Sequence, residues 1–563
     1  MRAISRATFV AAPVFGGVLL LLCALAFYYL AVIRIDYRKT ILLDLDPHTD
    51  AIEYFAQAKA LLQDGRPFIQ IGYEKLPSRF PFGYPALMLP WLKILPAVDA
   101  ILAPFRTNQT LGVLLLLAVF VFYTYLAMPL TGGLATLLLV TLPGFFTFCR
   151  SSISEISASL LIVLAFMFAY LGLSEERRWK IYLSAILLGL SVNIRIASFF
   201  FAPLLLAMAL FPLRGVRWRW LLHCSAIPIV FVIAVSPVLV LNYIQLQSPF
   251  KTGYDFWVSN ELLIISMRNI DNLYLGNGLF SLYYVPPNAL TLWKEFTLQP
   301  YGYDTAHLFG TGTVFVPAFL LLTCAGLVFI RGNRFVACAF SAGLTYAAAM
   351  LGYLFGRDGR FYLPLLILLV AVAVLPVNWA ARNLFAGRRL TALAIFVLFA
   401  GACLGYPSRS GYNTRDIGRS QAWDALHVAD PPRPSIQFAA QRDFATLLKR
   451  QPGIVLSDID PVYLNALLPR WFIAAPIDGN HHYKLSSTWR YDKPRAMALV
   501  EHGLQQSLPV YALFVSREEV ARNQARLPNV PGYEWRTLNN SHGNAAILKL
   551  TAVGSGQTAP VPE

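Results

Sequence analysis

The chain has 563 residues, of which 57% are hydrophobic and only 13% are charged. Soluble globular proteins carry about 25% charged residues, so this composition excludes a wholly soluble protein. The formal net charge of +16 fits basic cytoplasmic loops beside anionic lipid, and no nucleic-acid-binding motif accompanies it. The sequence therefore predicts a polytopic α-helical membrane protein.

The first apolar segment, residues 8–33, exceeds the apolar core of about 7–15 residues in a cleavable signal peptide, so we expect a retained helix. A membrane-spanning helix needs about 20 apolar residues. This criterion predicts about eleven spans, at 8–33, 110–127, 131–149, 156–173, 179–196, 197–212, 221–243, 311–330, 335–355, 361–379 and 390–406. The segment 197–212 is short for a complete span.

The loops predict the orientation of these spans. With a cytoplasmic N-terminus, every inner loop except a tight turn at 128–130 contains Arg or Lys, as the positive-inside rule requires. An odd number of spans then places the loops 34–109 and 244–310, and the C-terminus, outside. We expect a multi-pass protein of a bacterial inner membrane with a periplasmic C-terminal domain.

Three domains are predicted along the chain. Residues 1–406 form the transmembrane domain with both exported loops, 407–434 are polar and read as a linker, and 435–563 form a soluble domain. Within it, segments typical of strands (453–458, 471–477, 510–515, 545–550) alternate with segments typical of helices (461–468, 494–506). This alternation predicts a small α/β fold.

Four carboxylates lie within ten residues of the first exported loop: Asp44, Asp46, Asp50 and Glu53. Charged groups near hydrocarbon are costly, which makes such a cluster a candidate functional site. Residues 50–62 have apolar positions at helical spacing, so we expect an amphipathic helix in the interface plane, with Asp50 at its N-cap. Asp50 is a candidate general base; the alternative is that it only caps the helix.

Further charged residues fall on the predicted outer side. Glu155 stands at the mouth of an apolar helix, where it is a helix-start carboxylate, an acceptor-binding group or a metal ligand. Six basic residues on this side are exceptions to the positive-inside rule: Lys75, Arg79, Arg150, Arg195, Arg357 and Arg360. Guanidinium groups suit phosphate binding, although arginines at a membrane surface also reach toward lipid headgroups.

These motifs together resemble those of the membrane-embedded GT-C glycosyltransferases, in the branch of the protein O-mannosyltransferases and the lipid A aminoarabinose transferase. That branch has Asp-Glu in its first loop, then Tyr, Arg-Pro-Pro and Tyr-Pro. Here Asp50, Tyr54, Arg79-Phe-Pro and Tyr84-Pro85 match, and Arg360-Phe-Tyr-Leu-Pro enters a predicted span as in that family. The resemblance covers residues 8–406. The Glu that follows the Asp is Ala51 here, with Glu53 one turn away.

The resemblance implies a hexosyl- or pentosyl-type transferase that uses a polyprenyl-phosphate sugar donor and inverts the anomeric centre. The acceptor would be a hydroxyl or amine of a lipid such as lipid A, a cell-envelope glycan or a protein. Asp50 and Glu155 would be catalytic, and Lys75, Arg79, Arg357 and Arg360 would bind the donor phosphate. Glu53, Tyr54, Tyr84, Arg150 and Arg195 would support the site or the acceptor. The resemblance identifies no particular cofactor, and a divalent metal is left open.

Three alternatives are considered. A lipid or polysaccharide transporter would place its charged site near the bilayer midplane, within repeated halves, whereas these acids gather at one surface and no repeat is evident. A glycan ligase would use a diphosphate-linked donor. A non-catalytic assembly protein would bind envelope polymers through its C-terminal domain.

Overall fold

The computed structural model describes residues 2–34, 49–210, 217–257, 280–297, 315–329, 334–353, 356, 359–384, 444, 452–459, 461–467, 472–477, 493–514, 516–538 and 546–553. The chain divides into two compact units. Unit 1 comprises residues 1–36, 104–241 and 277–430, and unit 2 comprises 37–103, 242–276 and 431–563. Residues 37–103, from the predicted first exported loop, thus share a unit with residues 431–563. The predicted linker, 407–434, lies outside the described residues, so its boundaries stay predictions.

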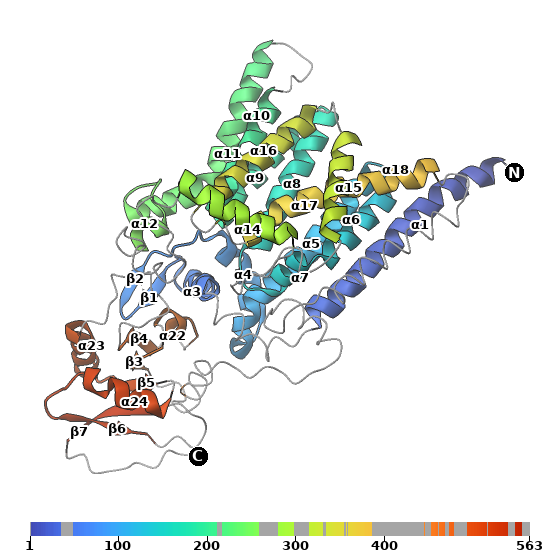
Figure 1. The fold of residues 1–563 in the computed structure, drawn as a ribbon. Coiled ribbons are helices and arrows are strands. Elements are labelled where there is room, and N and C mark those ends of the chain that lie inside the picture. The colour runs from blue at the N-terminus through green and yellow to red at the C-terminus, as the bar shows by residue number, and fades with distance from the viewer. Residues whose placement is uncertain are drawn as a thin grey trace. The chain divides into compact units, whose positions relative to one another are not determined.

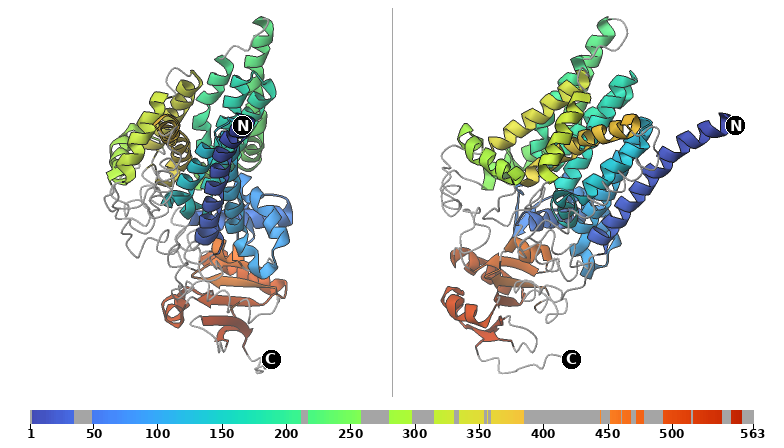
Figure 2. Two further views of the ribbon diagram at one scale, coloured as in Figure 1. Left: turned by 90° about the vertical axis from the view of Figure 1, so that its right-hand side faces the viewer. Right: turned by 45° about the vertical axis from the view of Figure 1, so that its right-hand side comes forward.

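Unit 1 is helical (Figures 1 and 2). Its elements are α1 (Arg2–Tyr28), η1 (Tyr29–Ile33), α5 (Ala103–Tyr125), α6 (Pro129–Thr141), α7 (Pro143–Arg150), α8 (Glu155–Ser174), α9 (Arg178–Ile194), η3 (Ile196–Phe201), α10 (Pro203–Leu210), α11 (Arg217–Leu246), η5 (Leu282–Tyr284), α14 (Val285–Thr297), α15 (Phe315–Phe329), α16 (Arg334–Leu351), η6 (Gly359–Tyr362), α17 (Leu363–Ala373) and α18 (Leu375–Leu384). The first residue of α5, Ala103, and the last residues of α11, 242–246, belong to unit 2.

Five helical segments in the described part of the chain are long and apolar enough to cross a membrane, as expected for a multi-pass protein. They are Pro13–Ile33, Asp99–Tyr125, Glu155–Ser174, Leu221–Leu246 and Gly359–Trp379. Ile196–Ala209 and Ala339–Leu351 are shorter apolar helices. The predicted total of about eleven spans stays a prediction, because segment 390–406 lies outside the described residues.

Two predicted spans differ from the structure. Segment 131–149 is not one straight helix, because α6 and α7 meet at a bend of 72°. Leu142 is extended at this bend and Pro143 starts α7, as proline restricts the preceding residue and suits the first turn of a helix. The span predicted at 110–127 begins earlier, at Asp99. The polar residues before 110 lower the local hydropathy, but they are part of helix α5.

Small residues allow the helices of unit 1 to pack closely, as is common in membrane proteins. Helices α1 and α6 lie side by side in both figures. A β-carbon on Gly17 would collide with the main-chain oxygen of Pro129, and one on Gly133 would collide with the main chain of Gly17. Helices α8 and α9 pack in the same way, with Gly172 against Ile181.

Unit 2 joins residues 37–103, from the predicted first exported loop, to the predicted α/β fold. The loop supplies α3 (Thr49–Asp64), the hairpin β1 (Ile69–Ile71) and β2 (Glu74–Leu76), α4 (Gly83–Ile94) and η2 (Ala97–Leu102). Residues 242–276, from the predicted second exported loop, add α12 (Gly253–Trp257), and residues 258–279 and 298–310 of that loop lie outside the described residues. The C-terminal part supplies β3 (Gly453–Ser457), α22 (Pro461–Leu467), β4 (Phe472–Pro476), α23 (Lys493–Gln505), β5 (Val510–Phe514), α24 (Arg517–Asn523), η8 (Gln524–Arg526), β6 (Tyr533–Thr537) and β7 (Ala546–Ala552).

The C-terminal strands form a five-stranded mixed sheet in the order β4-β3-β5-β7-β6 (Figure 1). Strand β3 runs parallel to β4 and β5, while β7 runs antiparallel to β5 and β6. All residues of β3 and β5 are buried, as expected for central strands covered on both faces. The predicted α/β fold is therefore confirmed in its strands and helices.

Candidate functional site

Helix α3 positions one line of polar side chains. Asp50, Glu53 and Gln57 are spaced by three and four residues and therefore share one face of the helix. The helix begins at Thr49, so Asp50 lies in its first turn and not at the N-cap that the sequence predicted. An acidic residue here still benefits from the helix dipole.

The amphipathic pattern of α3 predicted one exposed face, but residues 51–58 are all buried. Helix α3 contacts α4, α22 and β1, all within unit 2. Glu53 is completely buried and Gln57 is 1% exposed. Buried polar groups require hydrogen-bond partners, so this face of α3 must be satisfied by other protein groups.

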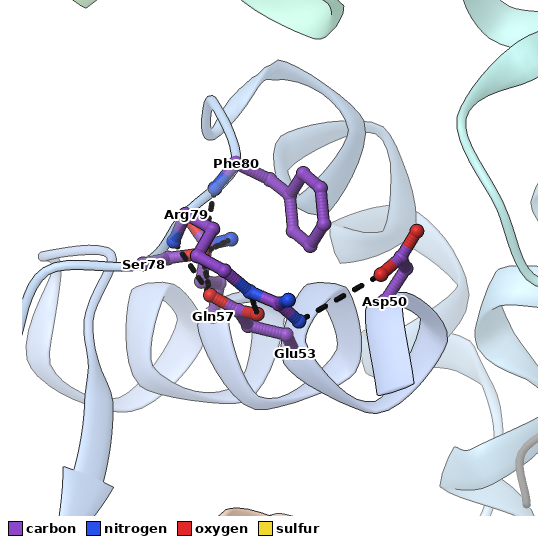
Figure 3. Close-up of polar contacts among 6 residues, drawn as sticks. All are labelled: Asp50, Glu53, Gln57, Ser78, Arg79 and Phe80. Atoms are coloured by element: carbon purple, nitrogen blue, oxygen red, sulfur yellow. Dashed lines mark hydrogen bonds and ion pairs between the residues drawn. The ribbon is translucent and has the colours of Figure 1, made fainter. Parts of the chain in front are cut away.

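Those partners come from the segment before α4 (Figure 3). Ser78 Oγ and the main-chain N–H of Arg79 donate to Oε1 of Glu53 over 2.7 and 2.6 Å, and Arg79 Nε donates to Oε2 over 2.8 Å. Gln57 Nε2 donates to Ser78 Oγ over 2.6 Å. Pro77 and Pro81 flank this segment and disfavour a helix, which leaves the N–H of Arg79 for Glu53.

Arg79 also reaches Asp50. Its Nη2 atom lies 3.7 Å from Oδ1 of Asp50, and the guanidinium lies between Glu53 and Asp50 (Figure 3). The side chain of Arg79 is 5% exposed, whereas that of Asp50 is 20% exposed. We call Asp50, Glu53, Gln57, Ser78 and Arg79 the α3 cluster. Asp50 is its carboxylate with the greater access to a bound molecule.

Aromatic rings enclose the α3 cluster. Phe80 lies 4.7 Å from Tyr54 and 5.7 Å from Tyr254 between ring centroids, and Tyr54 meets Tyr84 edge to face at 5.0 Å. The guanidinium of Arg79 lies 5.1 Å from the Phe80 ring. Tyr54 and Tyr84 are buried. The Phe80 ring thus lies against Arg79, and the tyrosine rings pack around Phe80 and Tyr54.

A second charged cluster lies in unit 1 at the start of α8. Helices α8 and α9 are antiparallel neighbours, so Glu155 at the first residue of α8 meets Arg195 directly after α9. Arg195 Nη1 donates to Glu155 Oε1 over 2.5 Å, and Arg360 Nε of η6 lies 3.7 Å from the same oxygen. We call these three residues the Glu155 cluster.

Both arginines of this cluster contact the same aromatic ring. The guanidinium carbons of Arg195 and Arg360 lie 4.4 and 5.2 Å from the centroid of Phe361. Glu155 is 3% exposed, and its Oε2 is buried with no hydrogen-bond partner within the described part of the chain. Two guanidiniums and one carboxylate give this cluster a net positive charge.

Other predicted site residues lie elsewhere. Lys75 is exposed and pairs with Asp64 over 3.0 Å at the far end of α3, about 21 Å along the helix from Asp50 by its rise of about 1.5 Å per residue. Arg150 is buried in the last turn of α7. Arg357, like Asp44 and Asp46, lies outside the described residues.

The sequence motifs do not include Gln57 or Ser78. The signal for Gln57 was its position four residues after Glu53, and the signal for Ser78 was its place beside Arg79. Among the described residues there is no group of three or more His, Cys, Asp or Glu side chains that could hold a metal ion. In the α3 cluster, Arg79 supplies the positive charge that both carboxylates contact.

No protein-family model and no curated protein matches this chain. Among solved structures, it is similar to ArnT from Cupriavidus metallidurans bound to undecaprenyl phosphate, with 13% identity and a TM-score of 0.54, over 94% of this chain and 97% of that one. The apo state of that ArnT has a TM-score of 0.52 at the same identity and coverage. Arabinofuranosyltransferase AftD from Mycobacteria has a TM-score of 0.43 and 12% identity, and the chain spans 41% of its length. The ArnT structures confirm the predicted GT-C glycosyltransferase fold.

Proposed function

We propose that this chain is a membrane glycosyltransferase that moves a sugar from a polyprenyl-phosphate donor to a hydroxyl or amine acceptor. Three features support this proposal. The fold is shared with an ArnT structure that holds undecaprenyl phosphate. The chain is a multi-pass membrane protein. Two clusters of acidic and basic side chains stand at helix starts, where the predicted orientation places the outer face of the inner membrane.

The observation that carries the proposal is the difference between the two carboxylates of the α3 cluster. Glu53 is completely buried and already accepts three hydrogen bonds, from Ser78 and Arg79. Asp50 is 20% exposed and stands beside the fixed guanidinium of Arg79. A general base must come within about 3 Å of the proton that it removes. Asp50 therefore serves as the base, and Glu53 holds Arg79 in place.

The reaction would proceed in one displacement. Asp50 accepts the proton of the acceptor hydroxyl or amine, whose oxygen or nitrogen attacks the anomeric carbon. The bond from that carbon to the phosphate oxygen breaks, and polyprenyl phosphate leaves with the bonding electrons. Attack opposite the leaving group inverts the anomeric centre.

The Glu155 cluster would bind the donor. Arg195 and Arg360 present guanidinium groups, which suit phosphate oxygens, and their charge would stabilise the phosphate as it leaves. The buried Oε2 of Glu155 would accept a hydrogen bond from a sugar hydroxyl. The acceptor would be lipid A, an envelope glycan or a protein.

Transfer of radiolabelled sugar in membranes supplied with polyprenyl-phosphate sugars tests this proposal. General bases contribute about 10²–10⁴-fold, so Asp50→Asn should lower the rate at least about 100-fold at equal protein level. Asp64→Asn, at the other end of the same helix, should keep normal rates. Transfer only from diphosphate-linked donors would instead identify a ligase, and normal transfer by Asp50→Asn would exclude Asp50 as the base.

A further inference from the structure

The C-terminal fold of unit 2 is hydrogen-bonded directly to helix α3. Lys59 Nζ donates to the main-chain oxygens of Asn465 and Ala466 over 3.4 and 3.0 Å. These two carbonyls lie in the last turn of α22, where a helix leaves its C=O groups without intrahelical partners. A cation is favourable at this end of a helix. Lys59 thus binds the end of α22 to the middle of α3.

Asn465 makes the second connection, from α22 to both neighbouring strands. Its Nδ2 donates to the main-chain oxygens of Gln70 in β1 and Ala474 in β4, over 2.8 and 3.1 Å. The N–H of Ala474 donates to Asn465 Oδ1 over 3.0 Å. The N–H of Gly72 also donates to the oxygen of Ala474 over 2.8 Å. The hairpin after α3 is therefore hydrogen-bonded to the edge strand of the C-terminal sheet.

The charge of Lys59 is costly in this place. Burial lowers the pKa of Lys59 to about 8, because removing an ammonium from water disfavours its charged form. A methionine would fill the same volume without this cost. Desolvated charges contribute little net stability, and their best attested role is to select one arrangement of the groups around them. Here the groups that Lys59 brings together are α3 and the end of α22.

We infer that the C-terminal α/β fold is a positioning element for the catalytic helix α3, with Lys59 and Asn465 as its positioning residues. Lys59 lies nine residues after Asp50 on one continuous helix, about 14 Å along its axis. A helix transmits a rotation at Lys59 to Asp50 and Glu53. Only the activity readout rests on the proposed function; the structural coupling can be measured without it.

The test uses the full-length protein in detergent, with Lys59→Met and Asn465→Ala as variants. Lys549→Met in β7 and Asn523→Ala at the end of α24 are the matched controls. The measurements are kcat, KM for the donor, Tm, and hydrogen–deuterium exchange of residues 49–64 compared with those of β3 and β5. Both variants should lower kcat at least tenfold with KM changed less than twofold, while Lys59→Met does not lower Tm. Exchange in α3 should become at least tenfold faster in Asn465→Ala, with β3 and β5 still protected.

Each other outcome is decisive. Unchanged exchange in α3 would overturn the inference, and so would kcat within twofold of wild type in both variants of an active enzyme. Equal loss of protection in α3, β3 and β5 would show that the contacts only maintain the fold of unit 2. If the wild-type protein transfers no sugar, the proposed function fails, and faster exchange confined to α3 still supports the positioning role.

Discussion

Arg79 contacts Glu53 at two points, through its main-chain N–H and through its side-chain Nε, over 2.6 and 2.8 Å. Both residues are almost entirely buried. The pair joins α3 to the segment before α4 and presents the far side of the guanidinium to Asp50 (Figure 3). Glu53, one turn after Asp50, thus holds the arginine that faces the candidate base.

Glu53→Gln should destabilise unit 2 and reduce activity. Removing one partner of a buried ion pair costs about 3–5 kcal/mol, because the other charge stays buried without compensation. We expect a lower Tm and a lower kcat with equal protein in the membrane. Glu501→Gln, on an exposed position of α23, should change stability by less than about 0.5 kcal/mol. An unchanged Tm in Glu53→Gln would contradict the role assigned to this pair.

Gly253→Ala, in helix α12, should displace Ser78 and Arg79 of the α3 cluster. A β-carbon at Gly253 would collide with the main-chain oxygen of Ser78 and lie 2.6 Å from Cα of Arg79. Helix α12 would have to move away, or Ser78 and Arg79 would lose their contact with Glu53. We expect at least a tenfold loss of kcat in the transfer assay. At Gly352 a β-carbon would meet no atom closer than 3.6 Å, so Gly352→Ala should retain activity.

Arg360→Gln should weaken donor binding. A hydrogen bond to a charged group contributes about 1.5–3 kcal/mol, which corresponds to roughly a 10- to 150-fold increase in KM for the polyprenyl-phosphate donor. KM measured over a range of donor concentrations checks this, with kcat from the same data. Arg177→Gln is the control, since Arg177 is exposed at the opposite end of α9 from Arg195. Equal KM values for both variants would remove Arg360 from the donor site.

Lys59 predicts a dependence of stability on pH. Its pKa is about 8 in the folded protein against an ordinary value of 10.5. Between these values the unfolded chain binds more protons, so stability should rise as pH increases from about 8 to about 10.5, by up to about 3 kcal/mol. Below pH 8 this gain is absent. Tm measured from pH 7 to 10 should rise more in wild type and Lys549→Met than in Lys59→Met. Parallel curves for all three would show that Lys59 is hydrated.

Sequence patterns located the α/β strands well, because β3 and β5 are continuous apolar runs in the centre of the sheet. They missed β6, whose five residues are exposed or only partly buried. A short edge strand buries too little apolar surface to leave a strong pattern. The bend between α6 and α7 was also missed, since apolarity measures the length of a span and not its straightness.

The sequence by itself determined that this is a multi-pass membrane protein with a C-terminal α/β fold, because hydropathy and strand patterns are local properties. It also singled out Asp50, Arg79 and Glu155 as candidates. Only the tertiary structure showed that Glu53 and Arg79 form a buried pair, that Lys75 pairs with Asp64, and that Lys59 holds α22. These contacts join residues up to about 400 positions apart. They depend on how helices and strands pack, which no local pattern encodes.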